Sequence, residues 1–125
     1  MKTRYLAFAI LFTAACGDDG AATPDAPSGT DAPVVASNIE TVNCAAGEPE
    51  VMATTGMYVP AATTIAVDGV VKFIMPSTHN VVPNPGADVN LKVNFSETKC
   101  LKFKAAGNYS FRCGPHNFMG SITVN

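Results

Sequence analysis

The sequence lacks an excess of charge of either sign. Of its 125 residues 14% are charged, and the formal net charge is −2. Beyond residue 35 the chain carries six acidic and six basic residues, so that part is formally neutral. A neutral domain has neither the basic surface of a nucleic-acid-binding protein nor the field that steers a charged partner from a distance. We therefore expect no nucleic-acid partner.

Long hydrophobic runs are also missing. The apolar run of residues 5–12 follows Lys2 and Arg4 and is shorter than the roughly 20 apolar residues of a membrane-spanning helix, so residues 1–15 fit an export signal. Cys16 follows Thr13-Ala-Ala, which resembles a bacterial lipoprotein cleavage site. We expect a lipid on Cys16 and a periplasmic protein of the bacterial cell envelope, anchored to a membrane. The alternative is a secreted protein in which Cys16 is a stray cysteine.

Residues 16–38 contain few side chains that could form a core. Gly, Ala, Pro, Asp, Ser and Thr dominate this stretch. Such a composition cannot bury enough apolar surface to offset the entropy lost on ordering. We therefore expect the lipidated cysteine and a flexible tether over residues 16–38, followed by one domain over residues 39–125.

The chain has only four cysteines. In an exported, oxidising setting, a lipid on Cys16 leaves an odd number, so one thiol stays unpaired. We take Cys113 as that thiol and predict a disulfide between Cys44 and Cys100. The alternatives are that both are buried thiols, or that Cys113 is the cysteine that pairs.

No segment shows a convincing helical period or an internal repeat. Apolar and polar residues instead alternate over short segments separated by Gly, Pro and Asn, which is typical of strands. The pattern predicts strands over residues 70–75, 91–95, 101–104, 108–113 and 121–125. Short strands in a body of this size favour an all-β, antiparallel sandwich with Greek-key connections.

Histidine is scarce, and both histidines lie beside other metal donors. His79 lies in Met75-Pro-Ser-Thr-His-Asn-Val-Val82, and His116 lies in Phe111-Arg-Cys-Gly-Pro-His-Asn-Phe-Met-Gly120. A thiolate and two imidazoles in a plane, with a weak thioether above it, suit a copper ion that cycles between Cu(I) and Cu(II). The sequence therefore predicts one mononuclear type 1 copper ion, with the ligands His79, Cys113, His116 and Met119.

Residues beside these ligands are expected to set their positions. Asn80 is placed to tie one ligand segment to the other by a hydrogen bond. Pro115 should stiffen the loop, and Gly120 should let the backbone turn into the last strand. The methionines Met52, Met57 and Met75 are interpreted as core fillers rather than as the donors of a Cu(I) carrier.

Residues 60–73, 79–82 and 106–120 resemble the plastocyanin and amicyanin branch of the blue copper proteins. The two residues between His116 and Met119 match the spacing in amicyanin, and the resemblance runs from about residue 50 to the end. It implies a cupredoxin fold, type 1 copper and one-electron transfer by a monomer that binds redox protein donors and acceptors transiently. It also implies that electrons pass through the edge of His116, within an apolar patch of Pro115 and Phe118.

The chain departs from that family at three places. Phe73 stands where tryptophan is common, and the tuning residue Gly114 replaces a hydroxyl residue that often partners the asparagine. Residues 83–90 are unlike those of familiar members. These departures concern tuning and partner choice.

Two other functions fit the same residues. One is a periplasmic copper carrier or storage module, and the other is a disulfide-stabilised surface domain whose metal is incidental. A copper enzyme is disfavoured, because the oxidases and nitrite reductases of this lineage need several more histidines and the chain has only two. We therefore expect no catalytic residues and no enzyme activity.

Replacing Pro115 tests its expected effect on the copper potential. Proline has no N–H and cannot donate a hydrogen bond to the Cys113 sulfur, which leaves the oxidised state comparatively favoured. Pro115→Ala restores a donor at this position and should raise the reduction potential measured by potentiometry. An unchanged or lower potential would contradict this expectation.

Overall fold

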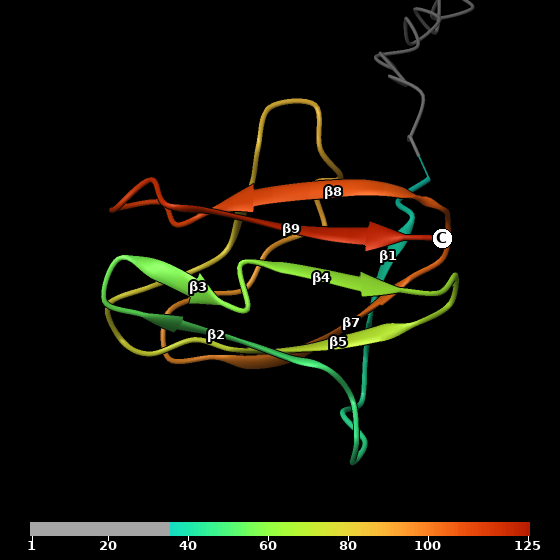
Figure 1. The fold of residues 1–125 in the computed structure, drawn as a ribbon, viewed down its shortest axis with the longest axis horizontal. Coiled ribbons are helices and arrows are strands. Elements are labelled where there is room, and N and C mark those ends of the chain that lie inside the picture. The colour runs from blue at the N-terminus through green and yellow to red at the C-terminus, as the bar shows by residue number, and fades with distance from the viewer. Residues whose placement is uncertain (1–35) are drawn as a thin grey trace, which may run out of the picture. The chain divides into compact units, whose positions relative to one another are not determined.

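The computed structural model describes residues 36–125, and within them nine strands and no helix form two packed sheets (Figure 1). One sheet contains, in spatial order, β1 (Ile39–Val42), β7 (Thr98–Phe103), β5 (Val70–Ile74), β2 (Glu50–Thr54) and β3 (Met57–Val59). The other contains, in spatial order, β4 (Ala62–Ile65), β9 (Met119–Val124), β8 (Gly107–Arg112) and β6 (Val82–Pro83). This is the all-β sandwich predicted from the short alternating segments.

The sheets are mixed rather than wholly antiparallel, so that part of the prediction is wrong. β2 runs parallel to β5, and β4 runs parallel to β9. Parallel neighbours require a long connection between them, and here the chain passes through β3 and through β4 of the other sheet before β5 pairs with β2. The alternation of side chains predicts which face is buried but contains no information about the direction of the neighbouring strand.

One predicted strand, over residues 91–95, does not form. Leu91 and Val93 are fully buried while Lys92 and Asn94 are exposed, as the alternation predicts, but Phe95 is 46% exposed and leaves the pattern. Only Val93 pairs with another segment, in a single bridge to Val81. The segment is a loop that packs apolar side chains under the sheets without a neighbouring ladder.

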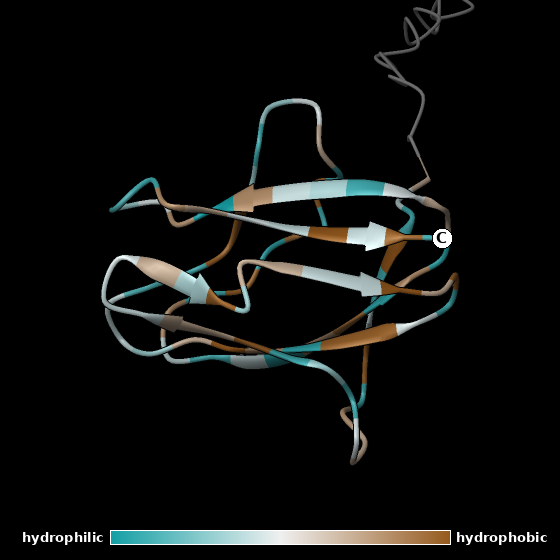
Figure 2. Cartoon of the chain, viewed as in Figure 1, coloured by the Kyte–Doolittle hydropathy of each residue, from teal (hydrophilic) through white to brown (hydrophobic). Residues whose placement is uncertain are grey.

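The core lies between the inner faces of the two sheets. Figure 2 shows hydrophobic and hydrophilic segments alternating along β8 and β9. The largest fully buried side chains come from both sheets and from the segments on either side of β6: Tyr58, Phe73, Phe103, Phe111, Ile39, Leu91, Leu101, Ile122, Val51, Val71, Val81 and Val93. The two sheets therefore share one continuous core, which fixes the strand ends that carry the site.

The methionines divide differently from the prediction. Met75 belongs to the core, with 3% of its surface exposed, whereas Met52 and Met57 are 43% and 56% exposed. Both lie at outward positions of β2 and β3, where the neighbouring residues Ala53 and Tyr58 take the inward positions. Interpreting Met52 and Met57 as core fillers was therefore wrong.

Gly120 has a packing role rather than the predicted turning role. It lies inside β9, opposite Phe111 of β8, and its φ is not in the left-handed region. A Cβ at this position would lie 2.6 Å from two ring carbons of Phe111 and 3.0 Å from a ring carbon of Tyr58. Only glycine leaves room for both rings at this place, so the prediction that Gly120 turns the backbone is corrected.

The start of the described chain is held by hydrogen bonds just before β1. The Asp88 carboxylate accepts hydrogen bonds from the Ser37 hydroxyl (2.6 Å) and the Asn38 N–H (2.6 Å). Burial acts to raise the pKa of Asp88, but these hydrogen bonds, with that from the Asn90 N–H, hold the pKa below its usual value.

The predicted export signal, Cys16 and the tether up to residue 35 lie outside the described residues. Within residues 36–125 no helix is long and apolar enough to cross a membrane.

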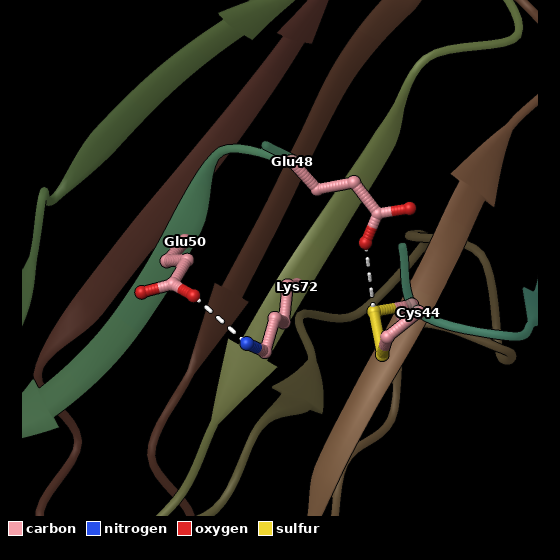
Figure 3. Close-up of a disulfide and its surroundings, with 5 residues drawn as sticks. Cys44, Glu48, Glu50 and Lys72 are labelled. Atoms are coloured by element: carbon pink, nitrogen blue, oxygen red, sulfur yellow. Dashed lines mark hydrogen bonds and ion pairs between the residues drawn. A yellow bond between two sulfur atoms is a disulfide. The ribbon is translucent and has the colours of Figure 1, made fainter. Parts of the chain in front are cut away.

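Cys44 and Cys100 form a disulfide, which is the pairing predicted above (Figure 3). Their Cα atoms are 5.3 Å apart, and the bond joins the segment after β1 to β7. Glu48 Oε2 lies 3.1 Å from the Cys100 sulfur, and Lys72 pairs with Glu50 at 2.8 Å. Cys113 is buried and free.

Replacing Cys44 and Cys100 together with alanine should lower the free energy of unfolding by about 4 kcal/mol, because the bond closes a loop with a sequence separation of 56. The measurement is denaturant unfolding of the copper-free protein. Reduced wild-type protein is the control and should lose a similar amount. A double variant as stable as the oxidised wild type would contradict the role of this bond.

Candidate metal centre

Three donor atoms from two distant segments converge at one end of the sandwich. Nδ1 of His79 lies 3.1 Å from Nδ1 of His116, and Sγ of Cys113 lies 3.6 Å from each of these nitrogens. His79 is 8% exposed and Cys113 is fully buried, whereas His116 is exposed. The structure thus brings together three of the four predicted ligands, with one of them open to solvent.

The spacing of these atoms fits a single metal ion. The point equidistant from the two nitrogens and the sulfur lies about 2.0 Å from each of them. Metal–imidazole bonds are about 2.0 Å long and metal–thiolate bonds about 2.3 Å, so small adjustments suffice. Among the described residues no further Cys, His, Asp or Glu joins this group. Two imidazoles and a thiolate without a fourth strong donor suit copper better than structural zinc, which takes four such ligands.

The loops that carry the ligands are short and internally bonded. His79 lies between β5 and β6, and Cys113 directly follows β8. The Asn117 N–H donates to the Cys113 carbonyl (2.9 Å), and the Cys113 N–H donates to the Phe118 carbonyl (3.0 Å). Asn117 takes a left-handed φ of 59°, which asparagine tolerates better than most residues. His116 is therefore presented from a closed turn between β8 and β9.

Asn80 joins the two ligand segments, as predicted. Its Oδ1 accepts a hydrogen bond from the Gly114 N–H (2.8 Å) and lies 3.7 Å from the Cys113 sulfur. A Cβ at Gly114 would lie 3.2 Å from the same oxygen. Glycine at this position therefore lets the side-chain amide of Asn80 approach the backbone closely.

Tyr58 supports this arrangement, a role that was not predicted from the sequence. Its hydroxyl donates to the Asn80 carbonyl (2.6 Å), and its ring packs edge-on against Phe111 and Phe118 at 4.8 and 4.7 Å. Burial raises the pKa of Tyr58, and the charge of Cys113 raises it further, so the phenol stays a donor at neutral pH. Nothing in the sequence indicated that Tyr58 reaches the metal segment.

Met119, the predicted fourth ligand, is placed differently from that expectation. Its side chain is 59% exposed. It pairs with Arg112 across β8 and β9, and partners of this kind share one face of a sheet. That face is the outer one, because Gly120 and Ile122 on alternate positions point into the core.

The residues predicted to form an electron-transfer patch lie at or near the surface. Pro115 and His116 are exposed, while Phe118 is half-buried and packs against the core. The Phe118 ring stacks on His116 with a centroid distance of 6.2 Å and an angle of 14°. The exposed imidazole is thus backed by an aromatic ring and flanked by a proline.

A second group of possible ligands carries no site. Cys44, Glu48 and Cys100 lie close together, but the two sulfurs are bonded to each other and cannot act as thiolates. Within the described residues the His79, Cys113 and His116 group is the remaining candidate metal centre.

Comparison with known proteins identifies the fold. No protein-family model matches the chain, and no curated protein matches it significantly. Among solved structures, a reduced Cu(I) form of an amicyanin variant matches with a TM-score of 0.60 and 20% identity, over 70% of this chain and 99% of that one. Amicyanin from Paracoccus versutus matches with a TM-score of 0.59 and 19% identity, over 71% and 99%. The chain therefore has the cupredoxin fold of amicyanin, and its His-Cys-His group can hold one copper ion.

Replacing Asn80 tests its role between the ligand segments. Asn80→Ala removes the acceptor of the Gly114 N–H and should lower the free energy of unfolding of the copper-free protein by about 1–3 kcal/mol. The measurement is denaturant unfolding. Asn94→Ala, in an exposed loop, is the matched control and should change stability by less than about 0.5 kcal/mol. Equal stabilities of the two variants would contradict the role of Asn80.

Proposed function

We propose that the protein transfers single electrons through one type 1 copper ion held by His79, Cys113 and His116. The observation that carries this proposal is the convergence of two imidazole nitrogens and one thiolate on a point about 2.0 Å from each. Bound copper would supply the exchange of one electron between Cu(I) and Cu(II). The amicyanin-like fold supports the same function.

The residues around the ligands suit electron transfer because they limit movement. Cys113 is fully buried at the end of β8, and Asn80 fastens its loop to the segment of His79. Tyr58 in turn holds the backbone of Asn80. A ligand set that moves little between two oxidation states lowers the barrier to electron transfer, and hydrogen-bonded neighbours provide this restraint.

Electrons would pass through the imidazole of His116. It is the ligand that reaches the surface, whereas His79 and Cys113 are covered. Pro115 beside it and the ring of Phe118 behind it give a small apolar contact area. Because the domain is formally neutral, we expect brief, weakly steered encounters with a redox protein donor and acceptor.

The cellular placement rests on the leader alone. We propose an exported monomer, tethered in the bacterial periplasm by a lipid on Cys16. The lipoprotein-like Thr13-Ala-Ala before Cys16 supports this placement. We propose no catalytic reaction, since both histidines of the chain are used in the one metal group.

A copper carrier or storage module is the second candidate. The exposure of Met52, Met57 and Met119 favours it, because thioethers are soft donors for Cu(I). A carrier must release its ion readily, however, and two of the three ligands of the proposed site are buried. Rapid loss of copper to a mild chelator would support this alternative.

Copper loading of the purified protein tests the proposal. We expect one Cu(II) per chain, an intense visible absorption from the thiolate and a reversible one-electron voltammetric wave. Cys113→Ser should abolish the absorption, because the oxygen of serine does not replace the thiolate. Thr78→Ala, an exposed neighbour of His79, is the control and should keep the colour. A colourless wild-type protein at full copper loading would overturn the proposal.

A further inference from the structure

The ring of Phe118 lies against both imidazoles of the metal centre. Its centroid is 5.2 Å from that of His79 at an angle of 70°, and 6.2 Å from that of His116 at 14°. The ring also contacts that of Tyr58, with a centroid distance of 4.7 Å. The Phe118 carbonyl also accepts the N–H of Cys113. The backbone of Phe118 is therefore hydrogen-bonded within the ligand loop, and its ring packs against the imidazole ligands.

Met119 is held on the opposite face by the register of β9. The pairs Met119 with Arg112 and Gly120 with Phe111 place Gly120, Ile122 and Val124 on the inner face. Side chains alternate with a period of two, so a shift by one residue that brought Met119 inward would expel Ile122 and Val124 from the core. It would also remove glycine from the place where the rings of Phe111 and Tyr58 leave no room for a Cβ.

We propose that the copper site has only three protein ligands, His79, Cys113 and His116, and that Phe118 takes the place of a thioether ligand. This inference rests on the proposed copper-binding function. The phenyl ring has no lone pair to donate, and its packing on both imidazoles excludes water from that side of the site. Met119 is then a surface residue with no bond to the metal.

The absence of a thioether has an effect on the reduction potential. Cu(II) gains more from an additional donor than Cu(I), which is stable with three ligands, so a missing donor favours the reduced state. An apolar shell that excludes water acts in the same direction, because it disfavours the more highly charged ion. The site should therefore have a higher potential than the same ligands with a thioether added.

The test compares sulfur ligation and potential in the copper-loaded full chain and its variants. X-ray absorption spectroscopy should show two nitrogens and one sulfur in both oxidation states. Met119→Leu should leave the visible absorption maximum and the potential unchanged. Phe118→Met should lower the equilibrium constant of reduction at least tenfold. For one electron this corresponds to a decrease in potential of about 59 mV. Phe118→Leu is the matched control without sulfur and should not show this decrease.

The outcomes separate this inference from the proposed function. A wild-type protein without copper-dependent colour overturns the proposed function. A coloured wild type with a second sulfur ligand, or a changed spectrum or potential in Met119→Leu, overturns the three-ligand site alone. If Phe118→Met fails to fold, the X-ray absorption spectrum of the wild type and the properties of the Met119→Leu variant still decide the question.

Discussion

The hydrogen bond from the Gly114 N–H to Asn80 Oδ1 joins the two segments on which the metal centre depends. His79 and Cys113 are 34 residues apart in the chain and belong to different loops. The hydrogen bond of 2.8 Å forms between two protein groups, so it holds the loops together without the help of a metal ion. Tyr58 fixes the carbonyl of the same asparagine. The entropy of bringing the ligands together is therefore lost when the protein folds. The ligands can then keep their positions when the charge of a bound ion changes.

The aromatic packing behind the ligands extends this restraint into the core. Phe111 contacts Phe73 and Tyr58 edge-on, and Tyr58 contacts Phe118. These rings can approach because Gly120 has no side chain. A close-packed interior has little free space in which a displaced side chain can be accommodated. A change of size at any of these rings should therefore shift the ligand loop.

The group of His79, Cys113 and His116 could be predicted from the sequence because it depends on residue type and spacing. Two histidines, one unpaired cysteine and an asparagine beside His79 are local features, and the count of cysteines indicated the disulfide. The face on which Met119 lies could not be predicted in this way. It depends on the register of β9 with β8 and on the demand of Phe111 for a glycine opposite it. The parallel pairs and the reach of Tyr58 to Asn80 are likewise properties of the assembled sheets, which short alternating patterns do not contain.

The hydrogen bonds of Ser37 and Asn38 to Asp88 hold the start of the described chain against the loop that follows β6. The C-terminus lies toward one end of the sandwich, whereas the loop between β8 and β9 lies at the other (Figure 1). The exposed His116, carried by this loop, therefore lies at the end of the sandwich opposite the C-terminus.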